Sequence, residues 1–475
     1  MGKGYDIYSP ESIEEYGKLL ENRTFKEILT ERDTLIKESE YAYQTSKEAK
    51  GSLGQLIEKY HFDYEPNSNP KPDFEEANVE LKVTPFKRLK NGKVSAKERL
   101  VLNIINYEEL VNERFEKSTF WLKNQLLLLI HYLYEKDKDK LDYLIKKVHL
   151  YRFRDKDLEV IKNDWEFIRN KVIKGKAHEI SEGDTSYLGA CTKGATKNSL
   201  RSQPYSDEKA MQRAFALKTS FMTTLLRQIM SEEAYEEITN TGELAQKSIQ
   251  EILNDRFKPY FGMTPAQIAE KVNIRFKPST KNIIPQIISA ILGIKGVKLD
   301  QIEEFAKANI EFKTVRLEPN GIPKEHMSFE NIRFNEVVKE SWQDSFIRNR
   351  FLDKKFLFVI FQYDESESKN NNREPYFKGI KLWNMPESIL DDKIYELWKA
   401  IQDKVRRGVR LTHHKWGSGY RTSNDLPGAD FNGVGHVRPK AQNSNDKVLL
   451  PDGQHITKQS YWLNREYISH IIENE

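Results

Sequence analysis

The sequence predicts a mixed α/β protein that is built from two copies of one domain. Three observations support this fold class. The chain has 475 residues, which at roughly 150 residues per domain allows two to four domains. Segments of the first half recur in the second half in the same order. Both halves also open with helix-start signals, continue into strands of alternating apolar and polar residues, and contain further helical segments.

The internal repeat is the strongest of these observations. GQLIE at 54–58 aligns with PQIIS at 285–289, and DFEEANVELK at 73–82 aligns with EFAKANIEFK at 304–313, both at an offset of 231 residues. Further pairs follow in the same order: KERL (97–100) with KEHM (324–327), NQLLLLIHYLYE (124–135) with KFLFVIFQYDE (355–365), and Trp165 with Trp398. Ordered matches over both halves indicate a tandem duplication. We expect a first domain over residues 1–235 and a second over 236–475, joined near the polar segment 239–248.

Each predicted copy begins with a helix. Thr24 with Glu27, and Thr264 with Gln267, have the capping-box spacing. An apolar helix then carries GQLIE or PQIIS, alternating strands follow, and helices recur over 157–173 and 391–405. No Pro-rich or low-complexity linker interrupts the chain.

The strand predicted over 78–83 carries the candidate chemistry. A period of two places its valines and leucine on one face, and Glu80 with Lys82 on the other. Asp73 lies seven residues before Glu80, in a Pro-Asp-Phe segment. Two carboxylates beside a lysine can form an oxygen-ligand site for Mg²⁺, with Asp73 and Glu80 as ligands and an ammonium near the attacking water. The pattern predicts phosphodiester hydrolysis. The alternative interpretation of the pattern alone is an exposed amphipathic strand edge.

The charge distribution is consistent with a nucleic-acid partner. The net charge is only +4, which by itself does not indicate such a partner. Three windows are much more basic than the mean: 82–99, 193–218 and 404–421. Basic loops that carry Gly, Ser, Thr and Asn are suited to phosphate contacts, although solvated surface loops have the same composition.

Other features narrow the class of protein. The single cysteine, Cys191, excludes an internal disulfide framework and a thiolate zinc cluster, and we expect it to be a small buried residue. The N-terminus has no apolar signal region, and the longest apolar run, 126–130, is too short for a membrane helix. We therefore expect a soluble cytoplasmic protein. His413 and His414 are adjacent, so on a strand they point to opposite faces, and we expect a DNA backbone contact rather than metal binding. Trp165 and Trp398 are expected to be core anchors rather than base-stacking platforms.

Several long segments resemble the MutH family of DNA endonucleases, and in particular its Sau-three-A-type restriction-enzyme branch. They are KGSLGQLIEKY, KPDFEEANVELKVTPF, KERLVLNIINYEEL, the stretch from NDWEF to TKGA, and RSQPYSDEKAMQRAFALKTSFM. The resemblance covers nearly all of residues 40–230. A weaker resemblance extends over the second half, including GHVRPKA and ITKQSYWLNREYI.

The resemblance implies a fold, an activity and site residues. The fold is the restriction-endonuclease core, PD-(D/E)xK, present in two tandem domains of which the second is a degenerate copy. The family's catalytic Asp-Glu-Lys falls on Asp73, Glu80 and Lys82, and its helix carboxylate falls on Glu58. The implied cofactor is Mg²⁺, and the implied target is the palindrome GATC in double-stranded DNA, cut before the guanine. DNA-binding positions fall on Lys97, Thr192, Lys193 (with Gly194) and Lys218, and on Arg438, Lys440 and Lys458, with Lys458 matching Lys218.

The second copy departs from the family pattern. Ser289 stands in place of the helix carboxylate, and Glu304 stands in place of the aspartate, while Glu311 and Lys313 are retained. A misplacement of about 1 Å can cost roughly a hundredfold in rate, so we expect the second site to be inactive and the second domain to bind another GATC copy as an effector. The first half also has Thr192-Lys193-Gly194 at the place where MutH has Arg-Pro-Lys. The second half of the chain keeps Arg-Pro-Lys, at 438–440.

The predicted function is a type II restriction endonuclease of bacterial origin. With one intact site per chain, we expect a monomer in solution that dimerises on its palindromic target. Two alternatives remain at this point: a strand-nicking mismatch-repair enzyme like MutH, which normally has a single copy, and a non-catalytic sequence-specific DNA-binding protein.

Overall fold

The computed structural model describes residues 4–31, 52–66, 70–193, 199–275, 283–295, 298–352, 354–364, 374–416 and 419–473. The chain forms two compact units, of which the first comprises Met1–Ser248 with Ala306–Ala308 and the second comprises Ile249–Phe305 with Asn309–Glu475. Within the described segments, no helix combines the length and the apolar character needed to cross a bilayer.

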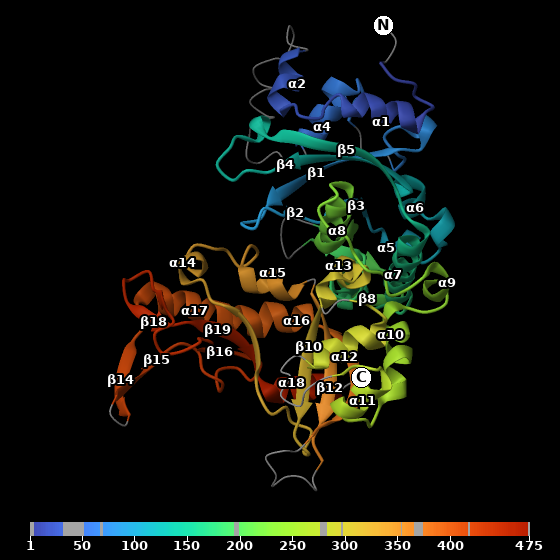
Figure 1. The fold of residues 1–475 in the computed structure, drawn as a ribbon. Coiled ribbons are helices and arrows are strands. Elements are labelled where there is room, and N and C mark those ends of the chain that lie inside the picture. The colour runs from blue at the N-terminus through green and yellow to red at the C-terminus, as the bar shows by residue number, and fades with distance from the viewer. Residues whose placement is uncertain are drawn as a thin grey trace. The chain divides into compact units, whose positions relative to one another are not determined.

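The first unit combines helices with two main sheets (Figure 1). Its helices are α1 (Pro10–Lys18), α2 (Phe25–Glu31), α4 (Ser52–Leu56), α5 (Tyr107–Leu110), α6 (Thr119–Asn124), α7 (Asp155–Ile173), α8 (Thr219–Ile229) and α9 (Thr241–Leu244). Its strands are β1 (Glu80–Arg88), β2 (Val94–Ala96), β3 (Leu100–Ile104), β4 (Leu126–Leu133), β5 (Leu144–Arg152), β6 (Leu188–Thr192), β7 (Leu200–Gln203), β8 (Ser206–Met211) and β9 (Arg213–Leu217).

The second unit has a similar set of elements. Its helices are α10 (Ile249–Phe257), α11 (Pro265–Lys271), α12 (Ile283–Leu292), α13 (Glu303–Ala308), α14 (Phe334–Val337), α15 (Phe346–Leu352), α16 (Glu387–Ile389), α17 (Tyr395–Arg407) and α18 (Arg465–Glu473). Its strands are β10 (Ile310–Leu317), β11 (Met327–Asn331), β12 (Lys355–Gln362), β13 (Tyr376–Asn384), β14 (Leu411–Trp416), β15 (Gly419–Asn424), β16 (Gly435–Pro439), β17 (Lys447–Leu449), β18 (His455–Thr457) and β19 (Gln459–Leu463).

The sheet topologies of the two units correspond in their central strands, although β2 has no counterpart among the described strands of the sheet formed by β10, β12 and β13. In the first unit β1 pairs parallel with β4, and β4 pairs antiparallel with β5, in the order β2-β1-β4-β5. In the second unit β10 pairs parallel with β12, and β12 pairs antiparallel with β13. The smaller sheets match as well, with the orders β3-β9-β6 and β11-β19-β16. The repeated sequence therefore has a repeated fold, as the mixed α/β prediction requires.

The first core lies between the larger sheet and the helices α1, α2 and α4, which Figure 1 shows on one side of β4 and β5. The apolar face of β1 is buried there, because Val79 is 0% and Leu81 is 4% exposed. The predicted apolar face, Val79, Leu81 and Val83, thus packs in this core, although the strand begins at Glu80 and Glu80 itself is also buried. Both predicted capping boxes are also present: Thr24 exchanges hydrogen bonds with Glu27, and Thr264 does so with Gln267.

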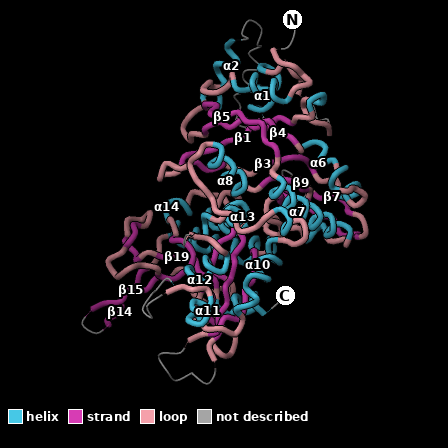
Figure 2. Tube along the Cα trace, turned by 45° about the vertical axis from the view of Figure 1, so that its right-hand side comes forward, coloured by secondary structure: helices cyan, strands magenta, loops and turns pink. Residues whose placement is uncertain are grey.

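One element has no counterpart in the first unit. The connection from α17 to β16 carries the antiparallel hairpin β14–β15, whereas the fully described connection from α7 to β6 forms no paired strands. Figure 2 shows this hairpin extending away from the rest of its unit. His413 and His414 lie on it, both exposed, and their rings contact the hydroxyls of Thr422 and Ser423 at 2.9 Å.

Candidate active site

The segment before β1 folds back so that Asp73 returns to the side of Glu80. Phe74 and Val79 exchange backbone hydrogen bonds of 2.9 and 3.2 Å. The residues between them form a 3₁₀ turn, and Asn78 adopts φ +54°, a left-handed conformation that asparagine tolerates better than most residues. This tight reversal explains how two carboxylates seven residues apart can belong to one site.

Hydrogen bonds lock the two carboxylates into the start of β1. The Leu81 N–H donates to Asp73 Oδ2 at 2.9 Å, and the Asp73 N–H donates to Glu80 Oε2 at 3.2 Å. Lys82 Nζ lies 2.6 Å from Glu80 Oε1. The structure therefore brings together Asp73, Glu80 and Lys82 as the sequence predicted, with Glu80 only 2% exposed.

A second ammonium, from Lys123, was not identified in the sequence. It lies in α6, directly before β4, and its Nζ is 3.6 Å from Glu80 Oε1. Because β4 pairs in parallel with β1, with Glu80 opposite Leu127, the residues that enter β4 lie beside those that enter β1. A strand-pairing prediction for 78–83 and 126–130 would have indicated this position, whereas spacing along the chain did not.

Glu58 completes the group from the helical layer. It lies in a π-helical turn, Ile57–His61, that follows α4, and such turns are frequent at functional sites. Burial, and then the charge of Asp73, raises the pKa of Glu58 to about 7, against the opposing effect of Lys82. Burial also raises the pKa of Glu80. The electrostatic influence of Asp73 and Glu80 on Glu58 indicates that the three carboxylates share one environment.

The raised pKa of Glu58 predicts a pH dependence of stability in the protein kept metal-free with EDTA. The folded pKa, about 7, is above the ordinary value of 4.5. The contribution to stability is therefore fully present below the unfolded pKa and is lost as pH rises through about 7. We expect the melting temperature of the parent to fall more steeply between about pH 5 and pH 8 than that of Glu58→Gln. Parallel melting-temperature profiles for the two proteins would contradict the assignment.

The carboxylates fit a divalent cation by their chemistry. Among the described residues, no three His, Cys, Asp or Glu side chains are already arranged as a metal site. Mg²⁺, however, is usually held by one or two carboxylates together with substrate phosphate oxygens rather than by a complete protein cage. Asp73 and Glu80 supply such a pair. Burial, and after it the charge of Asp73, raises the pKa values of Glu58 and Glu80, and a bound cation would stabilise their ionised forms.

The corresponding place in the second unit has a different composition. Glu311 Oε1 lies 2.9 Å from Lys313 Nζ, and Glu311 Oε2 lies 2.5 Å from Arg350 Nη2 and 3.6 Å from Lys354 Nζ. Burial would raise the pKa of Glu311, but these cations lower it overall. Glu304 is 0% exposed and lies in the regular helix α13, whereas Asp73 is in a half-buried turn.

The helix carboxylate is also missing from the second unit. Ser289 lies in α12, is buried, and its hydroxyl makes no hydrogen bond within the described part of the chain. Arg350 and Lys354 come from the segment before β12, just as Lys123 comes from the segment before β4. Spacing along the chain did not indicate these two residues either, because it is the parallel pairing of β12 with β10 that brings them to Glu311.

The predicted DNA-binding residues of the first unit fall into two groups. Lys97, Thr192 and Lys193 are exposed, and Lys97 Nζ lies 4.4 Å from the centre of the Tyr134 ring. Gly194 is outside the described residues. Lys218, by contrast, is 4% exposed, and its Nζ donates to the Thr185 carbonyl at 2.6 Å. Its ammonium therefore points into the unit, rather than lying on a surface loop as expected.

Strand register corrects two of the predicted correspondences between the halves. Leu217 in β9 and Leu463 in β19 occupy the same position, opposite Leu188 and Gly435 respectively. Counting on from these residues, Lys218 corresponds to Asn464, not to Lys458. The matching of Lys458 with Lys218 was wrong because the sequence alone did not fix the strand pairing.

The same strand pairing also changes, by one residue, which part of the first unit corresponds to Arg-Pro-Lys at 438–440. The Lys193 N–H donates to the Gln212 carbonyl at 2.7 Å, and the Lys440 N–H donates to the Lys458 carbonyl at 2.9 Å. Lys440 therefore corresponds to Lys193, and residues 438–440 correspond to 191–193 rather than to 192–194. Both units thus keep a lysine at this position.

The residues predicted to bind DNA in the second unit lie at the end of its smaller sheet. Arg438 and Lys440 are exposed, and the Arg438 guanidinium lies 5.9 Å from the centre of the Trp462 ring. Lys440 Nζ donates to the Phe329 carbonyl at 2.7 Å. Lys458 is half-exposed and pairs with Asp446 at 2.6 Å.

The other singled-out residues have structural roles. Trp165 is 0% and Trp398 is 4% exposed, so both are core residues as predicted. Cys191 is buried, and burial raises the pKa of its thiol, which disfavours a reactive thiolate.

Comparisons with known proteins agree with the repeated fold. The family model for the DNA mismatch repair enzyme MutH matches residues 62–164 and again residues 297–392. The first match contains Asp73, Glu80 and Lys82, and the second contains Glu304, Glu311 and Lys313, whereas Glu58 and Ser289 lie just before the matched ranges.

Similarity to one relative spans nearly the whole chain. The type II restriction enzyme Sau3AI of Staphylococcus aureus is 38% identical over 468 residues, covering 91% of this chain and 94% of that protein. The DNA mismatch repair protein MutH of Shewanella woodyi is 29% identical over 184 residues, which is 38% of this chain and 77% of that protein. MutH of Actinobacillus pleuropneumoniae is 24% identical over 221 residues, covering 45% and 88% of the respective chains.

Proposed function

The chain belongs to the Sau3AI-type branch of the MutH family and is a type II site-specific deoxyribonuclease, and from this premise we propose that its first unit cleaves double-stranded DNA at GATC with Mg²⁺. The observation that carries this proposal is the convergence of Asp73, Glu80 and Lys82 at the start of β1. The GATC target and the cut before the guanine follow from the family resemblance of residues 40–230.

Each residue has a distinct task in the proposed hydrolysis. Asp73 and Glu80 would hold the divalent cation, which when bound neutralises charge on the scissile phosphate. Lys82 orients the attacking water or stabilises the developing negative charge, and Lys123 places a second ammonium beside the same carboxylate. Glu58 adds a carboxylate whose raised pKa lets it accept a proton near neutral pH. The water attacks the phosphorus atom, and the bond between phosphorus and the 3′ oxygen breaks.

The proposal is tested by digestion of plasmid DNA that carries GATC sites, followed by sequencing of the cut ends. We expect ends that begin with 5′-GATC when Mg²⁺ is present, and no cleavage in EDTA. Cleavage at another sequence, or nicking of one strand only, would contradict the proposal. Running the same digestion on methylated and unmethylated plasmid measures the sensitivity to adenine and cytosine methylation.

We propose that the predicted second domain, residues 236–475, which contains the second unit, binds another GATC copy as an effector and does not cleave. Support comes from the loss of one carboxylate, because Ser289 lies in place of Glu58, and from the three cations that surround Glu311. Arg438, Lys440 and Lys458 are the proposed DNA contacts of this unit, and Lys97, Thr192, Lys193 and Lys218 those of the first. A contact by Lys218 would require its buried ammonium to leave Thr185.

Cleavage should depend on the number of sites in the substrate. Cutting both strands of a palindrome requires two active sites, so with one catalytic unit per chain we propose that monomers meet on DNA. At limiting enzyme, a plasmid with two GATC sites should be cut faster than one with a single site, because a second site on the same molecule has a high effective concentration. Equal initial rates on the two plasmids would contradict the effector role.

A further inference from the structure

The second unit contains a group of cations where the first unit contains its candidate metal site. We call it the cation cluster and define it as Lys313, Arg350, Lys354 and Lys440. Three of its members contact Glu311 directly, and the Arg350 Nε also donates to both oxygens of Glu330, at 2.8 and 2.9 Å. The fourth, Lys440, donates to the carbonyl of Phe329 at 2.7 Å, and the centre of the Phe329 ring lies 5.0 Å from Lys313 Nζ and 5.7 Å from the Arg350 guanidinium.

The balance of charge differs in sign between the two places. In the first unit, three carboxylates (Glu58, Asp73, Glu80) face two ammonium groups, Lys82 and Lys123. In the second unit, the contacts described for the cations of the cluster are with two carboxylates, Glu311 and Glu330. A site with excess negative charge attracts a divalent cation, whereas a site with excess positive charge repels it and attracts an anion.

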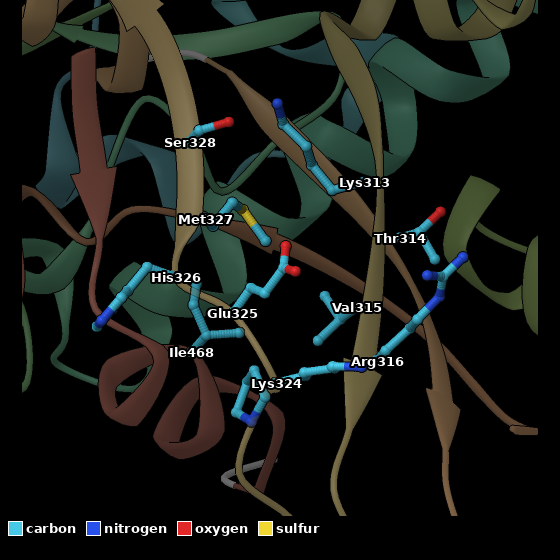
Figure 3. Close-up of a pocket in the computed structure, with 11 residues that line it drawn as sticks. Lys313, Thr314, Val315, Arg316, Lys324, Glu325, His326, Met327, Ser328 and Ile468 are labelled. Atoms are coloured by element: carbon cyan, nitrogen blue, oxygen red, sulfur yellow. The ribbon is translucent and has the colours of Figure 1, made fainter. Parts of the chain in front are cut away.

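The cation cluster also borders a cavity. Lys313 lines a cavity of about 390 Å³ between β10 and the segment 323–328, a size within the range of ligand pockets. Figure 3 shows Lys313 at one end, Arg316 and Lys324 at the other, and Glu325 between them. Three cations therefore line a space that an anionic group could enter.

We propose that the cation cluster binds a backbone phosphate of duplex DNA without any divalent cation. The inference rests on the proposed DNA-binding role of the second unit and deepens it by naming the site and the ligand chemistry. Two donors of Arg350 are engaged by Glu311 and Glu330, but its Nη1 makes no hydrogen bond within the described part of the chain and can donate to a phosphate oxygen. Lys313 and Lys354 add point charges. The lysine that matches the catalytic Lys82 of the first unit would thus serve phosphate binding in the second, where Glu311 opposes it.

Glu311 has a specific part in this site. Its carboxylate already contacts three cations of the cluster, so it competes with an incoming phosphate for the same donors. Removing its charge should therefore strengthen DNA binding both in EDTA and with a divalent cation present, whereas the loss of a carboxylate that holds the metal would weaken binding when the cation is present. The direction of the change in DNA affinity therefore distinguishes a phosphate-binding site from a weak metal site.

The test is fluorescence anisotropy of a labelled GATC duplex with the full chain in EDTA, where no cleavage occurs. We expect Glu311→Gln to tighten binding by roughly tenfold. Lys354→Gln should weaken binding by roughly tenfold and reduce the slope of log affinity against log salt by about one. A scrambled duplex should show the same ratios, because phosphate contacts carry no sequence information.

Controls make each outcome decisive. Lys399→Gln removes a half-exposed charge that pairs with Asp403 on α17, and it should leave the affinity unchanged. Circular dichroism confirms that each variant is folded; Arg350 is left intact because its buried guanidinium holds two carboxylates. Unchanged or weaker binding by Glu311→Gln, or an unchanged salt slope for Lys354→Gln, overturns the proposal.

Two further outcomes are separated by additional measurements. If the substitutions alter the binding of inorganic phosphate, measured by calorimetry, but not that of the duplex, the site takes a free anion and the proposal is overturned. Failure of the proposed nuclease function would instead appear as absence of GATC cleavage by the parent protein with Mg²⁺, which the EDTA binding experiment does not measure.

Discussion

Replacing Lys82 by alanine should lower the rate of DNA cleavage by about a hundredfold to a thousandfold. Lys82 Nζ lies 2.6 Å from Glu80 Oε1, so it is in position to act on the water or the charge that develops at a phosphate held by Asp73 and Glu80. Asp73→Ala should have an effect of at least this size, because it removes one of only two carboxylates proposed to hold the cation. Single-turnover cleavage of a GATC plasmid with Mg²⁺ measures both effects.

The matched control for this prediction lies at the corresponding position of the second unit. Lys313→Ala removes the equivalent ammonium, which the structure places beside a carboxylate already surrounded by cations. At saturating DNA it should change the single-turnover rate by less than about tenfold. Parental activity in Asp73→Ala or Lys82→Ala would disprove the assignment of the site. Loss of activity in Lys313→Ala equal to that in Lys82→Ala would disprove the assignment of catalysis to one unit.

Replacing Trp165 by alanine should destabilise the first unit by about 3–5 kcal/mol. The indole is 0% exposed in α7, and its ring meets Phe115 edge-on at a centroid distance of 5.7 Å. Truncation would leave a large cavity, because the surrounding side chains belong to packed elements that can collapse only in part. Urea unfolding followed by circular dichroism measures the loss.

Phe167 provides a control on the same helix. It is 42% exposed, so Phe167→Ala should change the free energy of unfolding by no more than about 1 kcal/mol. If Trp165→Ala instead kept the parental stability and lost DNA binding, the residue would be a base-stacking platform and the core assignment would be wrong.

Local signals in the sequence were sufficient for the elements and for part of the site. The alternation at 78–83 predicted that Val79, Leu81 and Val83 pack in the core, and the capping boxes at Thr24 and Thr264 are present. Asp73, Glu80 and Lys82 could be found because one tight turn and one strand bring them together. These contacts join residues that are close in the sequence, so the geometry of one turn or one strand fixes their relative positions.

Contacts between distant segments could not be found in this way. Lys123, Arg350 and Lys354 reach the two carboxylates only because the strand that follows each of them pairs in parallel with β1 or β10. The matching of Lys458 with Lys218 was wrong because the correspondence is fixed by the pairing of β9 with β6 and of β19 with β16, which joins distant segments and cannot be read from the local sequence.

By itself, the sequence determined the duplication, the mixed α/β class, the alternation of β1 and the carboxylate–lysine motif. Only the tertiary structure decided how each copy of that motif is surrounded. In the first unit, Glu58 joins two carboxylates and its pKa rises to about 7. In the second unit, cations surround Glu311 and its pKa falls. The reason is physical: the charge state of a buried group depends on burial and on neighbours within a few ångströms, and strand pairing brings those neighbours from distant parts of the chain.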